Sequence, residues 1–234
     1  MKKLLFTAAI AVFGFTTVNA QETKEESTFG FEQGNIIVEG NIGFNSSKST
    51  ESDNTGDLFE NNTSSINFNP KAGYFISDDL VIGVELNFGS AKDEDTFIGT
   101  TGFITESKTN NLGAGVFARY YFLELGKRFK TYGEFGAGFN SAKAETSQTG
   151  STSLLQDSES NSIGAGLGLG INYFISDSFA INFGLTDLLS FTTGTQKDNL
   201  DPTGFERKTA SFSGNINIFN NFFNTATFGL TYKF

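Results

Sequence analysis

Residues 112–122, Leu-Gly-Ala-Gly-Val-Phe-Ala-Arg-Tyr-Tyr-Phe, contain the pattern that decides the fold of this 234-residue chain. The even positions of the stretch are apolar or aromatic, whereas Gly113, Gly115 and Arg119 occupy odd positions. Successive side chains of a β-strand point to opposite faces, so a period of two predicts a strand with one apolar face. We interpret the opposite face of this strand, which carries Gly113, Gly115 and Arg119, as polar or glycine-rich.

The same alternation recurs in further stretches of the chain. They cover residues 36–44, 66–76, 80–88, 129–139, 163–175, 179–191 and 228–234. After residue 20, no segment approaches the roughly 18 apolar residues of a membrane-spanning helix, and no 3.6-residue period is sustained. The sequence therefore predicts an all-β protein with eight strands.

The connections between these strands are of two kinds. Short turns are expected at residues 77–79, 124–128 and 176–178. Long, polar and acidic segments are expected as loops at residues 46–63, 90–109, 141–160 and 192–210. Alternation of short and long connections is typical of a transmembrane barrel, in which the short turns are periplasmic and the long loops are extracellular. We therefore predict an eight-stranded antiparallel up-and-down transmembrane β-barrel, with a soluble up-and-down barrel or sandwich as the alternative.

Two features of the strands favour the membrane barrel. The polar face carries charges within the strands, at Glu39, Lys71, Glu85, Arg119 and Glu134. Aromatic residues mark the strand ends beside the short turns, at Tyr74, Tyr120, Phe122, Tyr173 and Phe179. A polar interior and an interfacial aromatic girdle are both features of barrels that face lipid.

The last strand gives a third argument. Its alternating side chains are Phe228, Leu230, Tyr232 and Phe234. This strand resembles the signal by which the assembly machinery recognises bacterial outer-membrane barrels. Residues 30–234 resemble the small eight-stranded, porin-like barrels typified by OmpX, OmpW and the transmembrane domain of OmpA, in the acidic, Gly- and Phe-rich style of Bacteroidota. The resemblance implies a monomer in the cell outer membrane, in contact with outer-membrane lipid, lipopolysaccharide and the assembly machinery.

The N-terminus has the three regions of a secretory signal. Lys2 and Lys3 precede an apolar run at residues 4–15, and Thr16-Thr-Val-Asn-Ala20 supplies a small-residue cleavage site. We expect residues 1–20 to be a signal peptide that is cleaved after Ala20, with a buried N-terminal helix as the alternative. Residues 21–33 are then a periplasmic tail, and residues 34–234 form the barrel.

The composition excludes several classes of function. The chain contains no His and no Cys, so it cannot form a Ser-His-Asp triad, a Cys nucleophile, or an imidazole or thiolate metal site. We therefore expect no enzymatic activity and no cofactor. A formal net charge of −10 opposes binding to a phosphate backbone, and we expect no nucleic-acid partner.

Turn symmetry predicts two ion pairs inside the barrel. Lys71 and Glu85 are equally distant from Asp78, and Arg119 and Glu134 are symmetric about the turn at residues 126–127. Their functional interpretation is an ion pathway or a gated polar lumen, and their structural interpretation is a plug of paired charges. We favour the plug, because eight strands enclose an interior that side chains can fill.

The polar segments leave several alternatives open. Their carboxylates, at Asp53, Asp57, Asp93, Glu94 and Asp95, could bind Ca²⁺, but they lack the spacing of an EF-hand loop, and we expect no metal. Residues 208–223 form a strand extension or a loop, and ten strands remain an alternative to eight. Protruding strand edges suit an adhesion-like role with an extracellular protein partner. A small pore or carrier for solutes or hydrophobic molecules is the alternative function.

Overall fold

The computed structural model describes residues 29–98, 103–151, 153–214 and 226–234. The strands in these ranges are β1 (Ile36–Asp53), β2 (Gly56–Ser77), β3 (Leu80–Phe97), β4 (Ile104–Leu125), β5 (Phe129–Gln148), β6 (Gln156–Phe174), β7 (Phe179–Asp198), β8 (Glu206–Gly214) and β9 (Ala226–Lys233). No helix in these ranges is long and apolar enough to cross a membrane.

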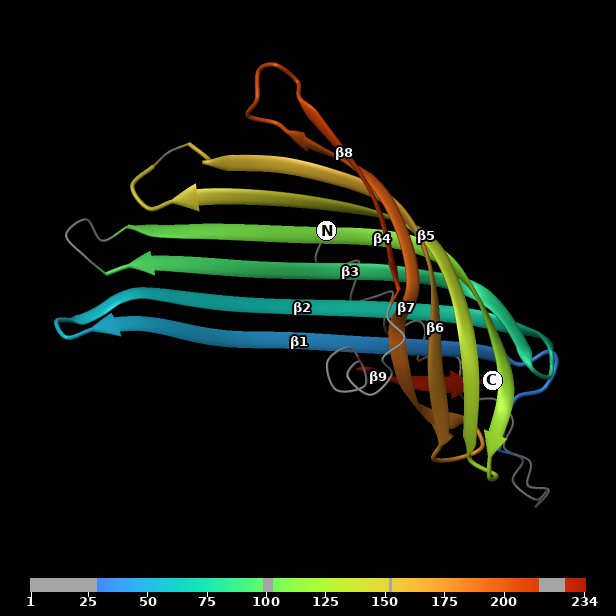
Figure 1. The fold of residues 1–234 in the computed structure, drawn as a ribbon. Helices are drawn as coiled ribbons and strands as arrows, with labels where there is room; N and C mark the ends of the chain where they lie inside the picture. The colour runs from blue at the N-terminus through green and yellow to red at the C-terminus, as the bar shows by residue number, and fades with distance from the viewer. Residues whose placement is uncertain (1–28, 99–102, 152, 215–225) are drawn as a thin grey trace.

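The strands form a closed antiparallel ring. From β1 to β7 each strand pairs with its neighbours in sequence. β9 closes the ring, because it pairs with β1 at residues 37–41 and with β7 at residues 179–185. β8 pairs with a later part of β7, at residues 189–197, so that β8 and β9 lie along successive parts of the same strand (Figure 1). The predicted eight-stranded ring is therefore confirmed, with β9 in its eighth position.

The short turns gather at one end of the barrel and the hairpin tips at the other (Figure 1). The turns connect β2 to β3 at residues 78–79, β4 to β5 at residues 126–128, and β6 to β7 at residues 175–178. Gly126 adopts a φ of 72° in the second turn, a conformation that glycine adopts readily. In this fold the short-turn end is periplasmic.

The connections at the other end are shorter than predicted. The prediction of long loops there is wrong, because most of these residues belong to strands. The segments at residues 46–63, 90–109, 141–160 and 192–210 continue largely as paired strands, and the connections between them shrink to residues 54–55, 98–103, 149–155 and 199–205. Both faces of these extensions meet water, so the apolar alternation stops, although the Thr-rich chain keeps strand geometry. β2 and β4 each have 22 residues. They exceed the ~9–11 residues that cross a bilayer, and the hairpins therefore project beyond it.

The segment before β1 enters the short-turn end of the barrel. The ring of Phe31 stacks on Phe75 with centroids 4.5 Å apart, and it lies 4.8 Å from the ring of Tyr121. The carbonyl of Gly30 accepts a hydrogen bond from Nζ of Lys233 at 2.8 Å. These contacts fix residues 30–31 against the interior and against the last strand.

Some predicted features lie wholly or partly outside the described residues. They are the signal peptide with its cleavage site at Ala20, residues 21–28 of the expected tail, and residues 215–223 of the expected strand extension. Within residues 208–223, the part up to Gly214 is strand and belongs to β8.

Candidate functional site

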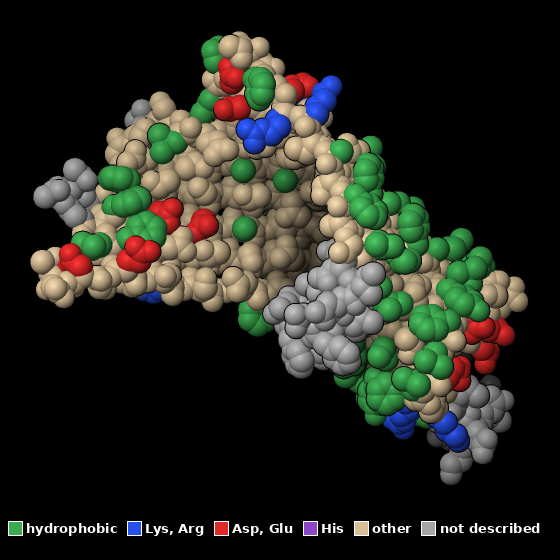
Figure 2. Space-filling model, viewed as in Figure 1, with side chains coloured by type: hydrophobic (Ala, Val, Ile, Leu, Met, Phe, Trp, Pro, Cys, Tyr) green, Lys and Arg blue, Asp and Glu red, His purple; other side chains and the backbone are tan. Residues whose placement is uncertain are grey.

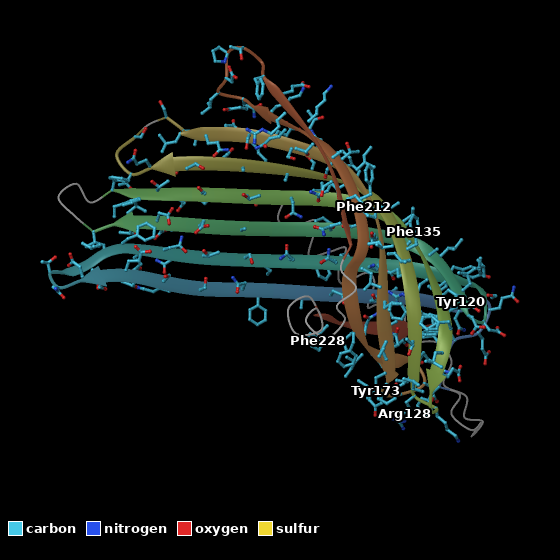
Figure 3. The ribbon with its side chains drawn as sticks, viewed as in Figure 1. Tyr120, Arg128, Phe135, Tyr173, Phe212 and Phe228 are labelled. Carbon is cyan, nitrogen blue, oxygen red and sulfur yellow. The ribbon has the colours of Figure 1, made fainter. Side chains whose placement is uncertain are left out.

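The outward face of the ring is apolar over much of its height. Its exposed large side chains include Ile42, Phe44, Ile66, Phe68, Ile82, Val84, Leu86, Leu112, Val116, Phe135, Phe139, Ile163, Leu167, Phe191, Phe212, Phe228 and Leu230. Figure 2 shows such side chains gathered over the outer wall, and Figure 3 labels three of them, Phe135, Phe212 and Phe228. We call this surface the apolar band. Its extent requires a non-aqueous neighbour.

Aromatic side chains surround the short-turn end of the outer wall. The rings of Phe129 and Tyr173 lie 4.7 Å apart, and those of Phe179 and Tyr232 lie 4.8 Å apart. Tyr120 is exposed on β4 towards the same end of the barrel (Figure 3). Aromatic rings with a polar edge are enriched where a protein crosses from lipid to water, so these residues mark the periplasmic edge of the apolar band.

The lumen at the same end is filled by apolar side chains. The buried cluster consists of Ile37, Phe75, Val81, Phe117, Tyr121 and Tyr132, with Phe31 packed against it. These side chains point away from the lipid-facing side of their strands, so the strands are apolar on both faces here. We call the cluster the apolar floor, because it fills the lumen at the short-turn mouth.

Arg119 is the centre of a buried ion network above the apolar floor. Its guanidinium is 1% exposed and donates hydrogen bonds to both carboxylate oxygens of Glu39, from Nη1 at 2.9 Å and from Nη2 at 3.0 Å. Its Nε donates to Oε2 of Glu134 at 2.7 Å. The ring of Tyr132 lies 4.0 Å from the guanidinium carbon, a distance at which a cation–π attraction adds to the ion pairs.

Lys71 extends this network to a third carboxylate. Its Nζ lies 2.5 Å from Oε1 of Glu134 and 2.8 Å from Oε2 of Glu85. The pairs Lys71–Glu85 and Arg119–Glu134 are thus joined through Glu134 into one group. With Glu39 included, the group has three carboxylates and two cations.

Hydrogen bonds connect the ion network to the remaining strands. Oε2 of Glu39 accepts from Nδ2 of Asn182 at 2.7 Å and from Oγ1 of Thr231 at 2.9 Å. Nδ2 of Asn172 donates to Thr231 at 3.0 Å, and the Tyr121 hydroxyl donates to Oδ1 of Asn172 at 3.1 Å. Every strand of the ring, β1 to β7 and β9, therefore contributes a side chain to one connected network.

A cavity of about 580 Å³ lies on the hairpin side of the network. Its walls include the amides Asn41, Asn69, Asn87 and Asn140, and the small residues Gly136, Gly138, Gly164, Gly166 and Gly168. Figure 2 shows the surface hollowed between the hairpins. The side chain of Glu85 is 30% exposed, and its Oε1 lies only 2.9 Å from the place that a Cβ on Gly115 would occupy. Small residues in the wall therefore keep room for this carboxylate.

Sequence reasoning identified four of the five charged side chains as lumen pairs, but it treated Glu39 only as a charge on the polar face. It missed Asn172 and Asn182, although the backbone register places them opposite each other across the third short turn. The symmetry used for the other two turns would have found them. It also missed Thr231, which the register places opposite Glu39.

The acidic residues considered as calcium ligands do not converge on one point. Asp93 and Asp95 both accept a hydrogen bond from Nδ2 of Asn61, each at 2.7 Å. Asp53 and Asp57 belong to the first hairpin. Across the described ranges, no group of three or more His, Cys, Asp or Glu side chains is arranged to hold a metal ion.

Two hairpin tips share an Asp-x-Thr-Gly turn, at residues 53–56 and 201–204. Oδ1 of Asp53 accepts hydrogen bonds from the hydroxyl and the backbone amide of Thr55, at 2.6 and 2.7 Å. Oδ1 of Asp201 accepts the same pair from Thr203, at 2.7 and 2.8 Å. These hydrogen bonds lower the pKa of both carboxyls, with the hydroxyl of Thr55 as the largest cause at Asp53 and the amide of Thr203 as the largest cause at Asp201.

Loss of the threonine hydroxyl predicts the same direction of change in both turns. Thr55→Val and Thr203→Val each remove a hydroxyl donor and should raise the pKa of Asp53 and of Asp201 towards the ordinary value of 3.8. Because both pKa values are depressed, the turns are stabilised above the ordinary value and lose this support as pH falls through the folded value. Titration of the carboxyl ¹³C resonances measures both values, and an unchanged pKa in either variant would contradict the assignment.

An apolar outer band, an aromatic girdle and a polar interior together define a transmembrane β-barrel. The model of the outer membrane protein beta-barrel domain matches residues 8–234, and the chain belongs to this family. The protein is therefore located in the cell outer membrane. No curated protein matches the chain.

Three solved structures of outer-membrane proteins are among those similar to this chain. OprG from Pseudomonas aeruginosa is 13% identical, with 88% of this chain and 98% of that chain covered and a TM-score of 0.48. Outer Membrane Protein W from E. coli is 18% identical, with 87% and 99% covered and a TM-score of 0.41. Ail, the attachment invasion locus protein of Yersinia pestis, is 16% identical, with 86% and 99% covered and a TM-score of 0.32.

Proposed function

We propose that this protein is a non-conducting, non-enzymatic barrel that holds long polar hairpins at the cell surface for contact with an extracellular partner. The observation that carries the proposal is the connected network to which every strand of the ring contributes. It lies above an apolar floor that fills the periplasmic mouth. Two different layers of side chains thus lie across the path that an ion would take.

The energetics of the network favour closure over conduction. An ion that passes Arg119 must displace hydrogen bonds made in a nearly water-free site, where Arg119 and Glu39 are 1% and 2% exposed. Separating buried partners leaves charges without compensation, which costs several kcal/mol. Eight strands also enclose an interior that side chains fill.

Current recording in planar bilayers tests closure directly. We expect the wild-type barrel to give no single-channel steps when its insertion is verified independently by protection from protease. Regular steps from the inserted wild-type protein would contradict the proposal and would favour a small pore.

The surface role rests on the form of the hairpins. Their strands stay paired almost to the tips, at Asp53–Gly56 in the first hairpin and Lys197–Glu206 in the fourth. Such extensions present a fixed polar surface well above the bilayer, where binding functions concentrate.

Truncation in register tests the surface role while the barrel is preserved. Thr193 and Ala210 are cross-strand partners, so residues 194–209 can be replaced by Asn-Gly, a dipeptide suited to a two-residue hairpin turn. The equivalent truncation in the first hairpin keeps the partners Ser47 and Thr63 and replaces residues 48–62. We expect normal assembly and loss of surface binding from at least one truncation. Unchanged binding after all four hairpins are shortened would contradict the role.

The cavity supports a second candidate, a carrier for small solutes. Its volume of about 580 Å³ lies within the range of small-molecule sites, and its amides with Glu85 favour a polar occupant over an apolar one. Mass spectrometry of the purified protein distinguishes the candidates, because a carrier should retain a stoichiometric small molecule.

Assembly and oligomeric state complete the proposal. Phe228, Leu230 and Phe234 on and beside β9 are exposed, which suits recognition of this strand by the assembly machinery before the ring closes. In the closed ring each strand pairs with a neighbour on both sides, so its backbone hydrogen bonds need no second copy of the chain. We therefore propose a monomer.

A further inference from the structure

The ion network leaves one negative charge uncompensated at the base of the lumen cavity. Among the described residues, the charged side chains that line this cavity are Glu39, Lys71, Glu85, Arg119 and Glu134. Three carboxylates against two cations leave a surplus of one negative charge. Both oxygens of Glu39 and both oxygens of Glu134 contact Arg119 or Lys71. The surplus charge therefore belongs to the third carboxylate.

Glu85 is this third carboxylate, and only one of its oxygens has a partner in the described part of the chain. Its Oε2 lies 2.8 Å from Nζ of Lys71, whereas its Oε1 neither accepts a hydrogen bond nor forms an ion pair with a described residue. Oε1 lies beside glycines, 2.9 and 3.6 Å from the places that a Cβ on Gly115 and on Gly136 would occupy. Because the side chain is 30% exposed and lines the cavity, a molecule in the cavity can reach this oxygen.

Amide side chains form a second row directly above the charged row. Asn41, Asn69 and Asn87 each stand two residues nearer the hairpins than the charged residue of the same strand, and an even spacing keeps them on the lumen side. Oδ1 of Asn41 is buried and accepts no hydrogen bond from the described residues. The side chains of Asn69 and Asn140 also make no hydrogen bond within these residues. The cavity thus offers unused amide donors and acceptors beside the free carboxylate oxygen.

The chemistry of this cavity favours an organic ammonium ion over a metal ion. Ca²⁺ takes about six to eight oxygen ligands, several of them from carboxylates, and no three acidic side chains of the described residues are grouped to hold a metal. An ammonium group has three N–H donors, which Oε1 of Glu85 and the amide oxygens can accept. The volume of about 580 Å³ far exceeds the ~30 Å³ of one water. It therefore has space for a carbon skeleton whose hydroxyl groups pair with the remaining amides.

Further carboxylates lie along the way into the cavity. Asp93 and Asp95 follow Glu85 on the same side of β3, and both accept a hydrogen bond from Nδ2 of Asn61. The lumen-facing positions of β3 beyond Glu85 include these acids and no cation. A cleft lined by one sign of charge concentrates ligands of the opposite sign. Cations are thus drawn into the hollow between the hairpins (Figure 2).

We propose that the cavity binds a small polyhydroxylated primary ammonium ion, the chemistry of a protonated amino sugar, with its ammonium group on Oε1 of Glu85. The inference names a ligand class for the cavity considered above as a carrier site. The route of entry rests on the proposed function, because the ion network and the apolar floor close the lumen below the cavity. The ligand then enters and leaves on the hairpin side, and binding requires no transport.

Isothermal titration calorimetry of the purified full-length barrel with glucosamine, in an amine-free buffer, tests the proposal. N-acetylglucosamine is the matched neutral probe, because acetylation removes the positive charge from the same ring. Glucosamine should bind at least about tenfold more tightly, since a hydrogen bond to a charged group contributes that much affinity. Glu85→Gln should weaken glucosamine binding by a similar factor, while Lys71 keeps its contact with Glu134. Glu94→Gln, on the outward side of β3, is the control and should leave the affinity unchanged.

Gly136→Ala provides a second variant, in which the charge of Glu85 is retained. Its Cβ would lie 3.6 Å from Oε1 of Glu85, so it fills part of the approach to this oxygen without a clash. It should weaken glucosamine binding several-fold in a folded barrel.

Three results would overturn the proposal. They are equal affinity for the two probes, wild-type affinity in Glu85→Gln, and no binding of glucosamine by the wild-type barrel. Each of them holds whether or not the barrel conducts. Single-channel steps from a barrel that binds glucosamine through Glu85 would contradict the proposed closure of the lumen and would support the ligand site.

Discussion

Replacement of Arg119 by alanine is expected to lower the free energy of unfolding of the barrel by about 3–5 kcal/mol, because it removes one partner of a buried ion pair. Glu39 would keep only its hydrogen bonds from Asn182 and Thr231, and Glu134 would keep only its contact with Lys71. Three interior carboxylates, Glu39, Glu85 and Glu134, would then remain with one cation, Lys71. Arg119 contacts Glu39, Glu134, the hydroxyl of Tyr121 and the ring of Tyr132.

Thermal unfolding in detergent, followed by circular dichroism, measures this loss. Arg119→Lys keeps a positive charge without the planar fork that binds both oxygens of Glu39, so it should retain part of the stability. Lys108→Ala on the outer wall is the surface control and should change stability by less than about 0.5 kcal/mol. A different result, with unchanged melting of Arg119→Ala and a new single-channel current, would show that the network is a gate and not a structural closure.

The local part of this network is predictable from the sequence. A short turn fixes the register of its hairpin, so counting outward from Asp78 is sufficient to place Lys71 opposite Glu85. The same counting places Arg119 opposite Glu134. Contacts across the lumen are different in kind. Glu39 meets Arg119 although 80 residues separate them, and this contact depends on how the closed ring tilts and staggers its strands, which alternation alone does not determine.

The outward face was predicted better than the inward one. Lipid favours apolar side chains at most outward positions of the band, so the parity of Phe44 or Phe135 is visible in the sequence. The inward face changes character along the barrel, from the apolar floor with Phe75 and Phe117 to the ion network and then to an open cavity. Runs such as Tyr74-Phe75-Ile76, apolar at consecutive positions, were the available signal that both faces are buried there.

Exposure to water on both faces explains why the strand extensions in the hairpins were predicted as loops. Strand prediction by alternation requires two different environments, and residues 46–53 have water on both faces. Backbone pairing continues nevertheless, since Ser47 still faces Thr63 and Thr50 still faces Glu60. A strand that leaves the membrane therefore loses its pattern before it loses its hydrogen bonds.

The glycines of the lumen wall are of two kinds. At some of them an added side chain would clash with neighbouring atoms, and at others it would fit. A Cβ on Gly83 would lie 2.2 Å from the backbone oxygen of Ala72 and 2.6 Å from the ring of Phe117. Phe117 is 3% exposed, and its ring lies 5.2 Å from Nζ of Lys71 and 5.7 Å from the guanidinium carbon of Arg119. Phe117 on β4 is the cross-strand partner of Gly83, and its ring beside both cations occupies the space that a side chain at residue 83 would need.

Gly83→Ala should therefore destabilise the barrel by about 1–3 kcal/mol through overpacking, and Gly136→Ala is its matched control. A Cβ on Gly136 would lie 3.6 Å from Oε1 of Glu85, an ordinary contact. Without a clash, replacing a strand glycine by alanine restricts the unfolded chain and should stabilise by about 0.4–1 kcal/mol. One chemical change should thus shift the melting temperature in detergent downwards at residue 83 and upwards at residue 136. Equal shifts at the two positions would contradict the close contacts of Gly83 with the backbone of Ala72 and the ring of Phe117, because a Cβ on Gly136 meets only ordinary contacts.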